Sequence, residues 1–150
     1  GNLTQAAIML ELMEQRKNNK NSSDVSAWNL LQGEIAMAQG RHEEALPLLE
    51  KALAAQDNNY SLESLAYCHY KAGHFSQARD LYLKLIGRHS LGWEAQRCWM
   101  EAHYNLALVY ESLGNKAAAK EYYEKLIHRW QQGNHELVLL AAAKENVKRL

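Results

Sequence analysis

The sequence predicts an all-α fold built from stacked antiparallel helical hairpins, and three observations support this. Ala, Leu, Glu, Lys and Gln are abundant while Val, Ile and Thr are scarce, which favours helix over strand. Apolar residues make up 47% of the chain, enough for a substantial core, and they recur at helical spacing. The third observation is an internal repeat marked by glycines, which predicts about three full repeats between a partial first repeat and a capping helix.

The repeat is aligned on three glycines. A small residue lies seven positions before each glycine and an alanine five positions after it. A large apolar or aromatic residue follows at nine positions, and a smaller core residue or leucine at twelve. The three sets are Gly40 with Gly33, Ala45, Leu49 and Ala52; Gly73 with Ala66, Ala78, Tyr82 and Leu85; and Gly114 with Ala107, Ala119, Tyr123 and Leu126.

Each repeated position has a physical reason. The glycine ends one helix in a left-handed conformation at no steric cost. The small residue before it and the alanine after it let two antiparallel helices approach closely, so the pairs Gly33/Ala45, Ala66/Ala78 and Ala107/Ala119 should be in contact. A single hairpin cannot bury its apolar edge alone, and it therefore stacks on a neighbour.

The expected helices follow from this alignment. In chain order they span 3–16, 24–39, 43–55, 59–72, 75–87, 91–113, 116–132 and 135–149. Ser23 or Asp24 is the expected N-cap of the second helix, and Asn58 or Asn59 that of the fourth. Ser90–Trp99 is expected to lengthen the sixth helix, and to pack on the preceding hairpin or to form a partner contact.

The whole chain is expected to be one domain. Gly1 joins the glycine series through Ala6, Leu10 and Met13, which predicts that the chain is a fragment of a larger protein. The expected parts are the second helix of a truncated repeat at 1–18, repeats at 24–58, 59–88 and 90–132, and a capping helix at 134–150.

This pattern resembles the tetratricopeptide repeat family, whose period is about 34 residues. The resemblance covers nearly the whole chain and implies a right-handed superhelix that binds other proteins. The sequence departs from the family pattern because no proline closes a unit and Trp28 lies one position early. The segment Glu101–Leu150 is also similar to the last repeat of several bacterial multidomain signalling and regulatory proteins.

The family resemblance implies that the first helix of each unit lines a concave wall. The groove positions would then be Ala27, Leu30, Glu34 and Met37; Tyr60, Glu63, Tyr67 and Tyr70; and Glu101, Tyr104, Leu108 and Glu111. Such a groove is aromatic in the middle and acidic around it, and only Lys71 obviously opposes the acidic groups. It predicts a peptide or protein partner with apolar anchors and Lys or Arg. The alternative is that some of these tyrosines are core residues and the glutamates an ordinary solvated face.

One subgroup of the family clamps the C-terminal carboxylate of chaperones with cationic and amide side chains. The corresponding positions here are Leu30, Glu34, Ser64, Glu101 and Asn105, none of them cationic. We therefore expect no binding of chaperone C-termini.

Other function classes have little support in the sequence. Seventeen basic residues balance seventeen acidic ones, so neither a nucleic-acid footprint nor a membrane-binding polybasic segment is expected. No phosphate loop or catalytic motif is present, and His69 and His74 lack metal-site spacing. We expect no cofactor, no metal, no enzymatic activity, reduced thiols at Cys68 and Cys98, and a cytoplasmic location.

The alternative function is self-association. Ile8, Met9, Leu12 and Met13 would be exposed on the first helix if nothing covers it, and such apolar strips favour association. A homodimer is therefore the alternative to a peptide-binding module.

Overall fold

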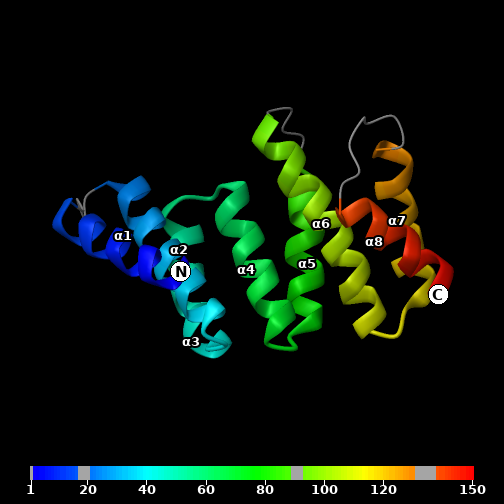
Figure 1. The fold of residues 1–150 in the computed structure, drawn as a ribbon, viewed down its shortest axis with the longest axis horizontal. Coiled ribbons are helices and arrows are strands. Elements are labelled where there is room, and N and C mark those ends of the chain that lie inside the picture. The colour runs from blue at the N-terminus through cyan, green and yellow to red at the C-terminus, as the bar shows by residue number, and fades with distance from the viewer. Residues whose placement is uncertain (1, 17–20, 89–92, 131–137) are drawn as a thin grey trace. The chain divides into compact units, whose positions relative to one another are not determined.

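The computed structural model describes residues 2–16, 21–88, 93–130 and 138–150, and every regular element in these residues is an α-helix (Figure 1). The helices are α1 Asn2–Arg16, α2 Ser22–Ala38, α3 His42–Ala55, α4 Asn59–Lys71, α5 Phe75–Ile86, α6 Trp93–Ser112, α7 Lys116–Trp130 and α8 Val138–Arg149. The predicted all-α class is confirmed, and each helix end that was expected within the described residues lies within two residues of its expected position.

Glycine turns end α2, α4 and α6 in the same way. Gly40, Gly73 and Gly114 have φ values of 77°, 81° and 75°. At the first turn the Gly40 amide donates to the Met37 carbonyl oxygen at 2.9 Å, and the Arg41 amide donates to Ala36 at 2.9 Å. The other two glycine turns repeat this pair of hydrogen bonds, which occupies carbonyls that the helix end leaves open.

Asparagine side chains cap α2 and α4. The Ser61 amide donates to Asn58 Oδ1 at 2.9 Å, so the N-cap of α4 is Asn58, one of the two residues expected. The expected cap at Ser23 or Asp24 is wrong, because the Ser23 amide donates to Asn21 Oδ1 at 3.0 Å and the helix begins earlier. Asn21 is itself a strong N-cap type, so it can cap a helix that begins before Ser23.

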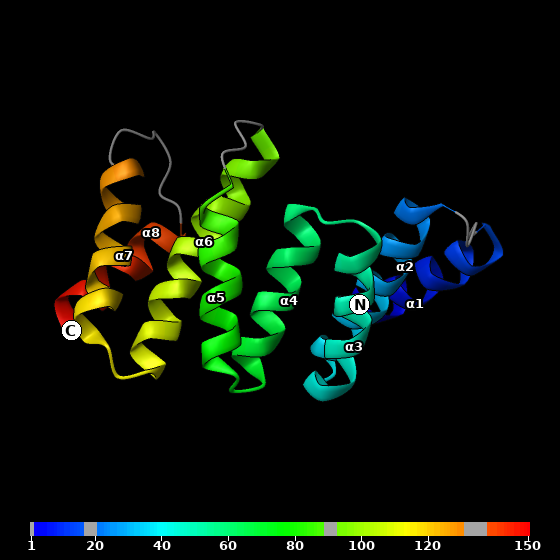
Figure 2. The ribbon, with the colours of Figure 1, turned by 180° about the vertical axis from the view of Figure 1, so that it is seen from behind.

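The chain divides into two compact units, residues 1–74 and 75–150, and each is described by itself. The expectation of a single domain over 1–150 stays a prediction. In the first unit α2 and α3 form a hairpin, α4 packs on both of them, and α1 packs on α2. In the second unit α6 packs between α5 and α7, and α8 packs on α7 and contacts α6 (Figure 2).

Close helix approach in the first unit depends on Gly33. A Cβ atom at this position would lie 2.5 Å from Leu49 Cδ2 and 3.6 Å from the Ala45 carbonyl oxygen. The predicted Gly33/Ala45 contact is thus confirmed. The Ser26 hydroxyl, also buried in this hairpin, donates to the Ala52 carbonyl oxygen at 2.9 Å.

In the second unit the two residues of the predicted pair, Ala107 and Ala119, are both fully buried. A cluster of buried side chains surrounds Ala107 and reaches α8, and it consists of Met100, Ala107, Tyr123, Leu126 and Ala143. Val147 and Leu150 pack against this cluster, so α8 caps the hairpin as expected. Ala66 and Ala78 are also fully buried, but they belong to different units, so their contact stays a prediction.

The expected helix limits at 91, 132 and 135 lie outside the described residues, and the expected lengthening of the sixth helix lies partly outside them. For the segment Ser90–Trp99, the described part places Cys98 in the core and stacks Trp99 on Trp130 of α7, with ring centroids 6.1 Å apart.

Candidate functional site

An exposed aromatic surface lies on α4. Tyr60 and Tyr67 are 38% and 39% exposed, and Tyr70 is half-buried. The Tyr67 and Tyr70 ring centroids lie 6.3 Å apart, and Lys71 Nζ lies 5.9 Å from the Tyr67 centroid. We refer to Tyr60, Tyr67, Tyr70 and Lys71 as the α4 surface.

Helical spacing explains why these side chains face outward. The opposite face of α4 is buried through Leu62, Leu65, Ala66 and Cys68. Positions three and seven residues apart share one face of a helix, which places Tyr60, Tyr67 and Tyr70 together on the remaining side. The α4 surface is thus the polar and aromatic side of an amphipathic helix.

The predicted positions on α2 lie beside α4. The Ser64 hydroxyl of α4 donates to Glu34 Oε1 of α2 at 2.9 Å, which joins the two helices at the surface. Leu30 and Met37 on α2 and Glu63 on α4 are half-buried. Ala27 and Glu34 are exposed. The first unit therefore brings the acidic and aromatic positions of α2 and α4 together.

The predicted positions on α6 are more covered. Tyr104 and Leu108 are half-buried and pack against the core cluster of the second unit. The Tyr104 ring centroid lies 5.6 Å from that of the buried Tyr123. The alternative interpretation, that some of the predicted tyrosines are core residues, fits Tyr104.

The glutamates on α6 have cationic neighbours. Arg149 Nη2 of α8 lies 2.5 Å from Glu111 Oε2, and Arg97 Nε lies 3.8 Å from Glu101 Oε1. The expectation that only Lys71 opposes the acidic groups is therefore wrong. The arginine at position 149 lies outside the expected groove rows, and only the packing of α8 on α6 brings it to Glu111.

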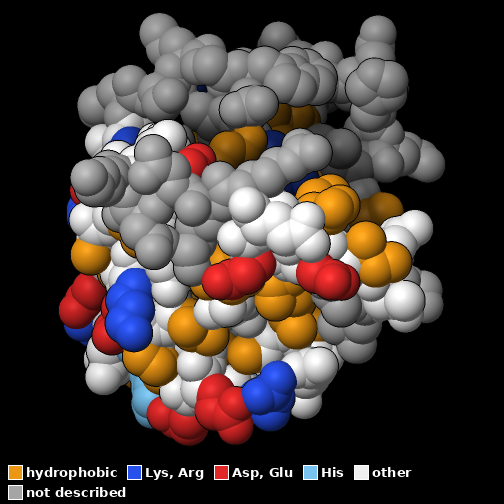
Figure 3. All heavy atoms as spheres, turned by 90° about the vertical axis from the view of Figure 1, so that its left-hand side faces the viewer, with side chains coloured by type: hydrophobic (Ala, Val, Ile, Leu, Met, Phe, Trp, Pro, Cys, Tyr) orange, Lys and Arg blue, Asp and Glu red, His pale blue; other side chains and the backbone are white. Residues whose placement is uncertain are grey.

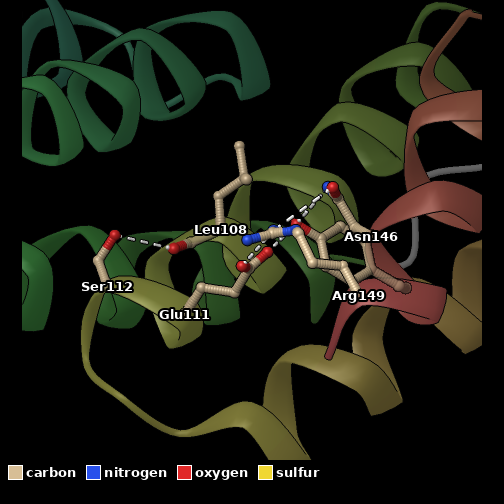
Figure 4. A network of polar contacts seen from close by, with 6 residues as sticks. Leu108, Glu111, Ser112, Asn146 and Arg149 are labelled. Atoms are coloured by element: carbon tan, nitrogen blue, oxygen red, sulfur yellow. Dashed lines mark hydrogen bonds and ion pairs between the residues drawn. The ribbon is translucent and has the colours of Figure 1, made fainter.

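Glu111 belongs to a polar network between α6, α7 and α8 (Figure 4). The buried Tyr123 hydroxyl donates to Glu111 Oε1 at 2.7 Å and accepts from Asn146 Nδ2 at 3.0 Å. Burial and the Glu111 carboxylate raise the pKa of Tyr123 well above its usual range. The Glu111 side chain is only 15% exposed, so this carboxylate is committed to the interior contacts of the second unit.

Sequence reasoning missed an aromatic group around His103. The buried His103 ring lies 3.6 Å from the Trp99 ring, centroid to centroid, and 6.0 Å from the Tyr122 ring. His103 Nδ1 donates to the Trp99 carbonyl oxygen at 2.8 Å, and burial lowers the pKa of His103 to about 4. The four-residue step from Trp99 to His103 was the available signal, since it places the two rings on one helix face.

Other chemistry has little support among the described residues. They contain no group of three or more His, Cys, Asp or Glu side chains placed to hold a metal ion. Burial raises the pKa of the Cys68 thiol to about 11, so it is a poor nucleophile. No described helix is long and apolar enough to cross a bilayer. The expected absence of enzymatic activity, metal and cofactor stays a prediction.

Comparison with known proteins bears on the repeat. A family model described as tetratricopeptide repeat matches residues 36–89, and a second model with the same description matches residues 101–128. Together the two matches cover more than half of the chain. The chain belongs to the tetratricopeptide repeat superfamily. Proteins with this repeat bind protein partners, so the coarse prediction of a protein-interaction scaffold is confirmed.

Solved structures of this superfamily share the fold. A candidate kinesin light chain from Podosopora anserina with nearly identical TPR-like repeats has a TM-score of 0.73 and 18% identity, covering 97% of this chain and 77% of that one. A variant of it has a TM-score of 0.74 and 20% identity, with the same coverage. The Sgt2 TPR domain from Aspergillus fumigatus has a TM-score of 0.63 and 22% identity, covering 89% and 80%. At these identities the likeness shows the fold alone.

No curated protein matches the chain. The similarity of Glu101–Leu150 to bacterial signalling proteins and the cytoplasmic location therefore stay predictions.

Proposed function

We propose that this tetratricopeptide repeat protein binds a peptide or partner protein segment through the α4 surface and the adjoining face of α2. The observation that supports the proposal most directly is the exposure of Tyr60 and Tyr67 next to the half-buried Tyr70. Tyrosine supplies a large contact area with few rotatable bonds, so little conformational entropy is lost on binding.

The charge of this face suggests the partner. Glu34 and Glu63 flank the tyrosines, and Lys71 is the cation beside them. A segment with apolar anchors and Lys or Arg side chains would complement these groups. Glu101, Tyr104, Leu108 and Glu111 were part of the same predicted site, but they contribute less here. Core packing and α8 cover much of Tyr104, Leu108 and Glu111, and Glu101 lies beside Arg97.

The chemistry of α2 and α4 disfavours one family ligand. Leu30, Glu34 and Ser64 occupy positions at which the chaperone-binding subgroup holds a carboxylate. Glu34 would repel a C-terminal carboxylate, so we expect no measurable affinity for chaperone C-terminal peptides. The proposed partner also includes neither nucleic acid nor a membrane surface, since the chain carries no net charge.

The test is selection of peptides from a random displayed library, followed by binding measurements on variants. Selected peptides should combine apolar anchors with Lys or Arg. Tyr67→Ala with Tyr70→Ala should lower their affinity at least tenfold, or about 1.4 kcal/mol. Leu83→Ala, at an exposed apolar residue of α5, is the control that should leave affinity unchanged. If the folded double variant binds the peptides with unchanged affinity, the α4 surface is not the binding site.

A second candidate function, self-association, is favoured by a different observation. Ile8, Met9 and Leu12 on α1 are 55%, 55% and 46% exposed. Three neighbouring exposed apolar side chains on one helix form a strip of the kind that contacts another protein surface.

A further inference from the structure

The exposed apolar strip of α1 departs from the repeat pattern of the other second helices. Ile8 and Leu12 lie seven and eleven positions after the glycine reference position. The same two positions are exposed in α3, α5 and α7, where they hold a proline or a charged residue: Pro47 and Lys51, Asp80 and Lys84, and Glu121 and Lys125. Packing within a hairpin therefore does not account for apolar side chains at these positions of α1.

The hairpin-facing side of α1 is also incompletely covered. Ala6, Leu10 and Met13 are half-buried, whereas the residues at the matching positions of the other hairpins are almost completely buried. Within the described residues, α1 packs on α2 alone. A broad apolar side of α1 is thus available to a further surface.

A second apolar surface lies at the other end of the chain, on the second unit. A groove with a volume of about 650 Å³ runs between α7 and α8 and is lined by Ile127, Val138, Ala141, Ala142 and Val147, with Lys144, Glu145 and Lys148 at its edge. Val138 is 84% exposed, the highest exposure among the large hydrophobic side chains of the described residues. Small alanines on the groove wall let a helix approach closely.

The charges of the two surfaces are complementary. By sequence α1 carries Glu11, Glu14 and Arg16, a net charge of −1. The groove edge carries Lys144 and Lys148 against one acidic residue, Glu145, which pairs with Lys148 at 2.7 Å. A helix with a net negative charge and an apolar strip therefore matches an apolar groove with a net positive edge.

From these observations we infer that α1 of one copy of the chain docks into the α7–α8 groove of a second copy, head to tail. The inference rests on self-association, the second candidate function, and is independent of peptide binding at the α4 surface. Figure 3 shows the side of the first unit that carries α1, where hydrophobic side chains lie next to acidic ones. Because the two docking surfaces differ, the contact is heterologous, and each added copy leaves one of each surface free.

The test uses two variants of the 150-residue chain that each block one surface. Ile8→Glu with Leu12→Glu blocks α1, and Val138→Glu with Ala141→Glu blocks the groove; all four side chains are exposed, so the fold should persist. In sedimentation equilibrium the unmodified chain should show a mass that rises with concentration above 17.1 kDa. Each blocked variant alone should stay at the monomer mass.

Mixing the two blocked variants is the decisive step. Each retains the surface that the other lacks, so the mixture should form a one-to-one complex and nothing larger. Leu113→Glu, at an exposed apolar residue outside both surfaces, is the control and should associate like the unmodified chain. A second measurement, Glu11→Lys in the groove-blocked variant, should weaken the mixed complex, and Lys144→Glu in its α1-blocked partner should restore it.

Two results would overturn the inference, and they are distinguishable. If the unmodified chain is monomeric at every concentration, both self-association and head-to-tail docking are wrong. If it associates but the blocked variants do not complement each other, self-association stands and the head-to-tail geometry is wrong.

Discussion

The first helices α4 and α6 occupy equivalent places in the repeat, yet they present different surfaces. On α4, Tyr67 is exposed and Tyr70 lies beside it. On α6, Leu108 and Glu111 occupy the same two register positions and are covered by core packing and by Arg149. Repeat register alone therefore does not create a binding surface. Whether a position on the first helix of a repeat is exposed depends on how the neighbouring helices pack over it.

The largest expected difference concerns stability. Tyr104→Ala should lower the free energy of unfolding by about 2–3 kcal/mol, because it removes packing against the core cluster of the second unit. Tyr67→Ala should change it by less than about 0.5 kcal/mol, as is usual for exposed positions. Urea denaturation of both variants measures the contrast, and equal losses would contradict it.

The next effect is a pH dependence that arises from His103 in the second unit. The pKa of His103 is about 4 in the folded chain, below its ordinary value of 6.5, so the unfolded state binds the extra proton between these values. Stability should therefore fall as the pH drops from 6.5 towards 4, by on the order of 2 kcal/mol.

Tryptophan fluorescence in a Trp28→Phe background would report this loss from the second unit. His103→Gln, which cannot titrate, should flatten the dependence, and His128→Gln, at an exposed histidine, should leave it unchanged. An identical acid profile with and without His103 would show that another group is responsible.

A smaller effect should follow from uncovering α6. Arg149→Ala removes the ion pair with Glu111 and should cost about 1 kcal/mol, since the arginine itself is largely exposed. It should also leave Tyr123 bonded to Glu111, because that hydrogen bond belongs to α6 and α7. Denaturation of Arg149→Ala and of Arg149→Lys checks the size, and a loss as large as that of Tyr104→Ala would contradict this ordering.

Much of the fold could be predicted from the sequence because local rules decide it. The left-handed turns at Gly40, Gly73 and Gly114 follow from the conformational freedom of glycine. The close helix approach at Gly33 follows from its lack of a side chain. Asn21 was missed as a cap because Ser23 and Asp24 compete for the same role in sequence.

The site could be predicted only in part, because exposure depends on packing between distant segments. The α4 positions lie on a polar helix face that periodicity reveals. The partners of Tyr104 and Glu111 come from α7 and α8. The spacing of residues within α6 does not indicate that Arg149 reaches Glu111. The ring contacts of His103 with Trp99 and Tyr122 were missed for the same reason.

Hydroxyl-radical footprinting with mass spectrometry, on the free chain and on the chain bound to a selected peptide, tests the contrast between α4 and α6 most directly. In the free chain Tyr67 should be oxidised much faster than Tyr123, with Tyr104 between them. Peptide should protect Tyr67 and Tyr70 and leave Tyr104 unchanged. Protection of Tyr104 without protection of Tyr67 would contradict the assignment of the α4 surface as the binding site.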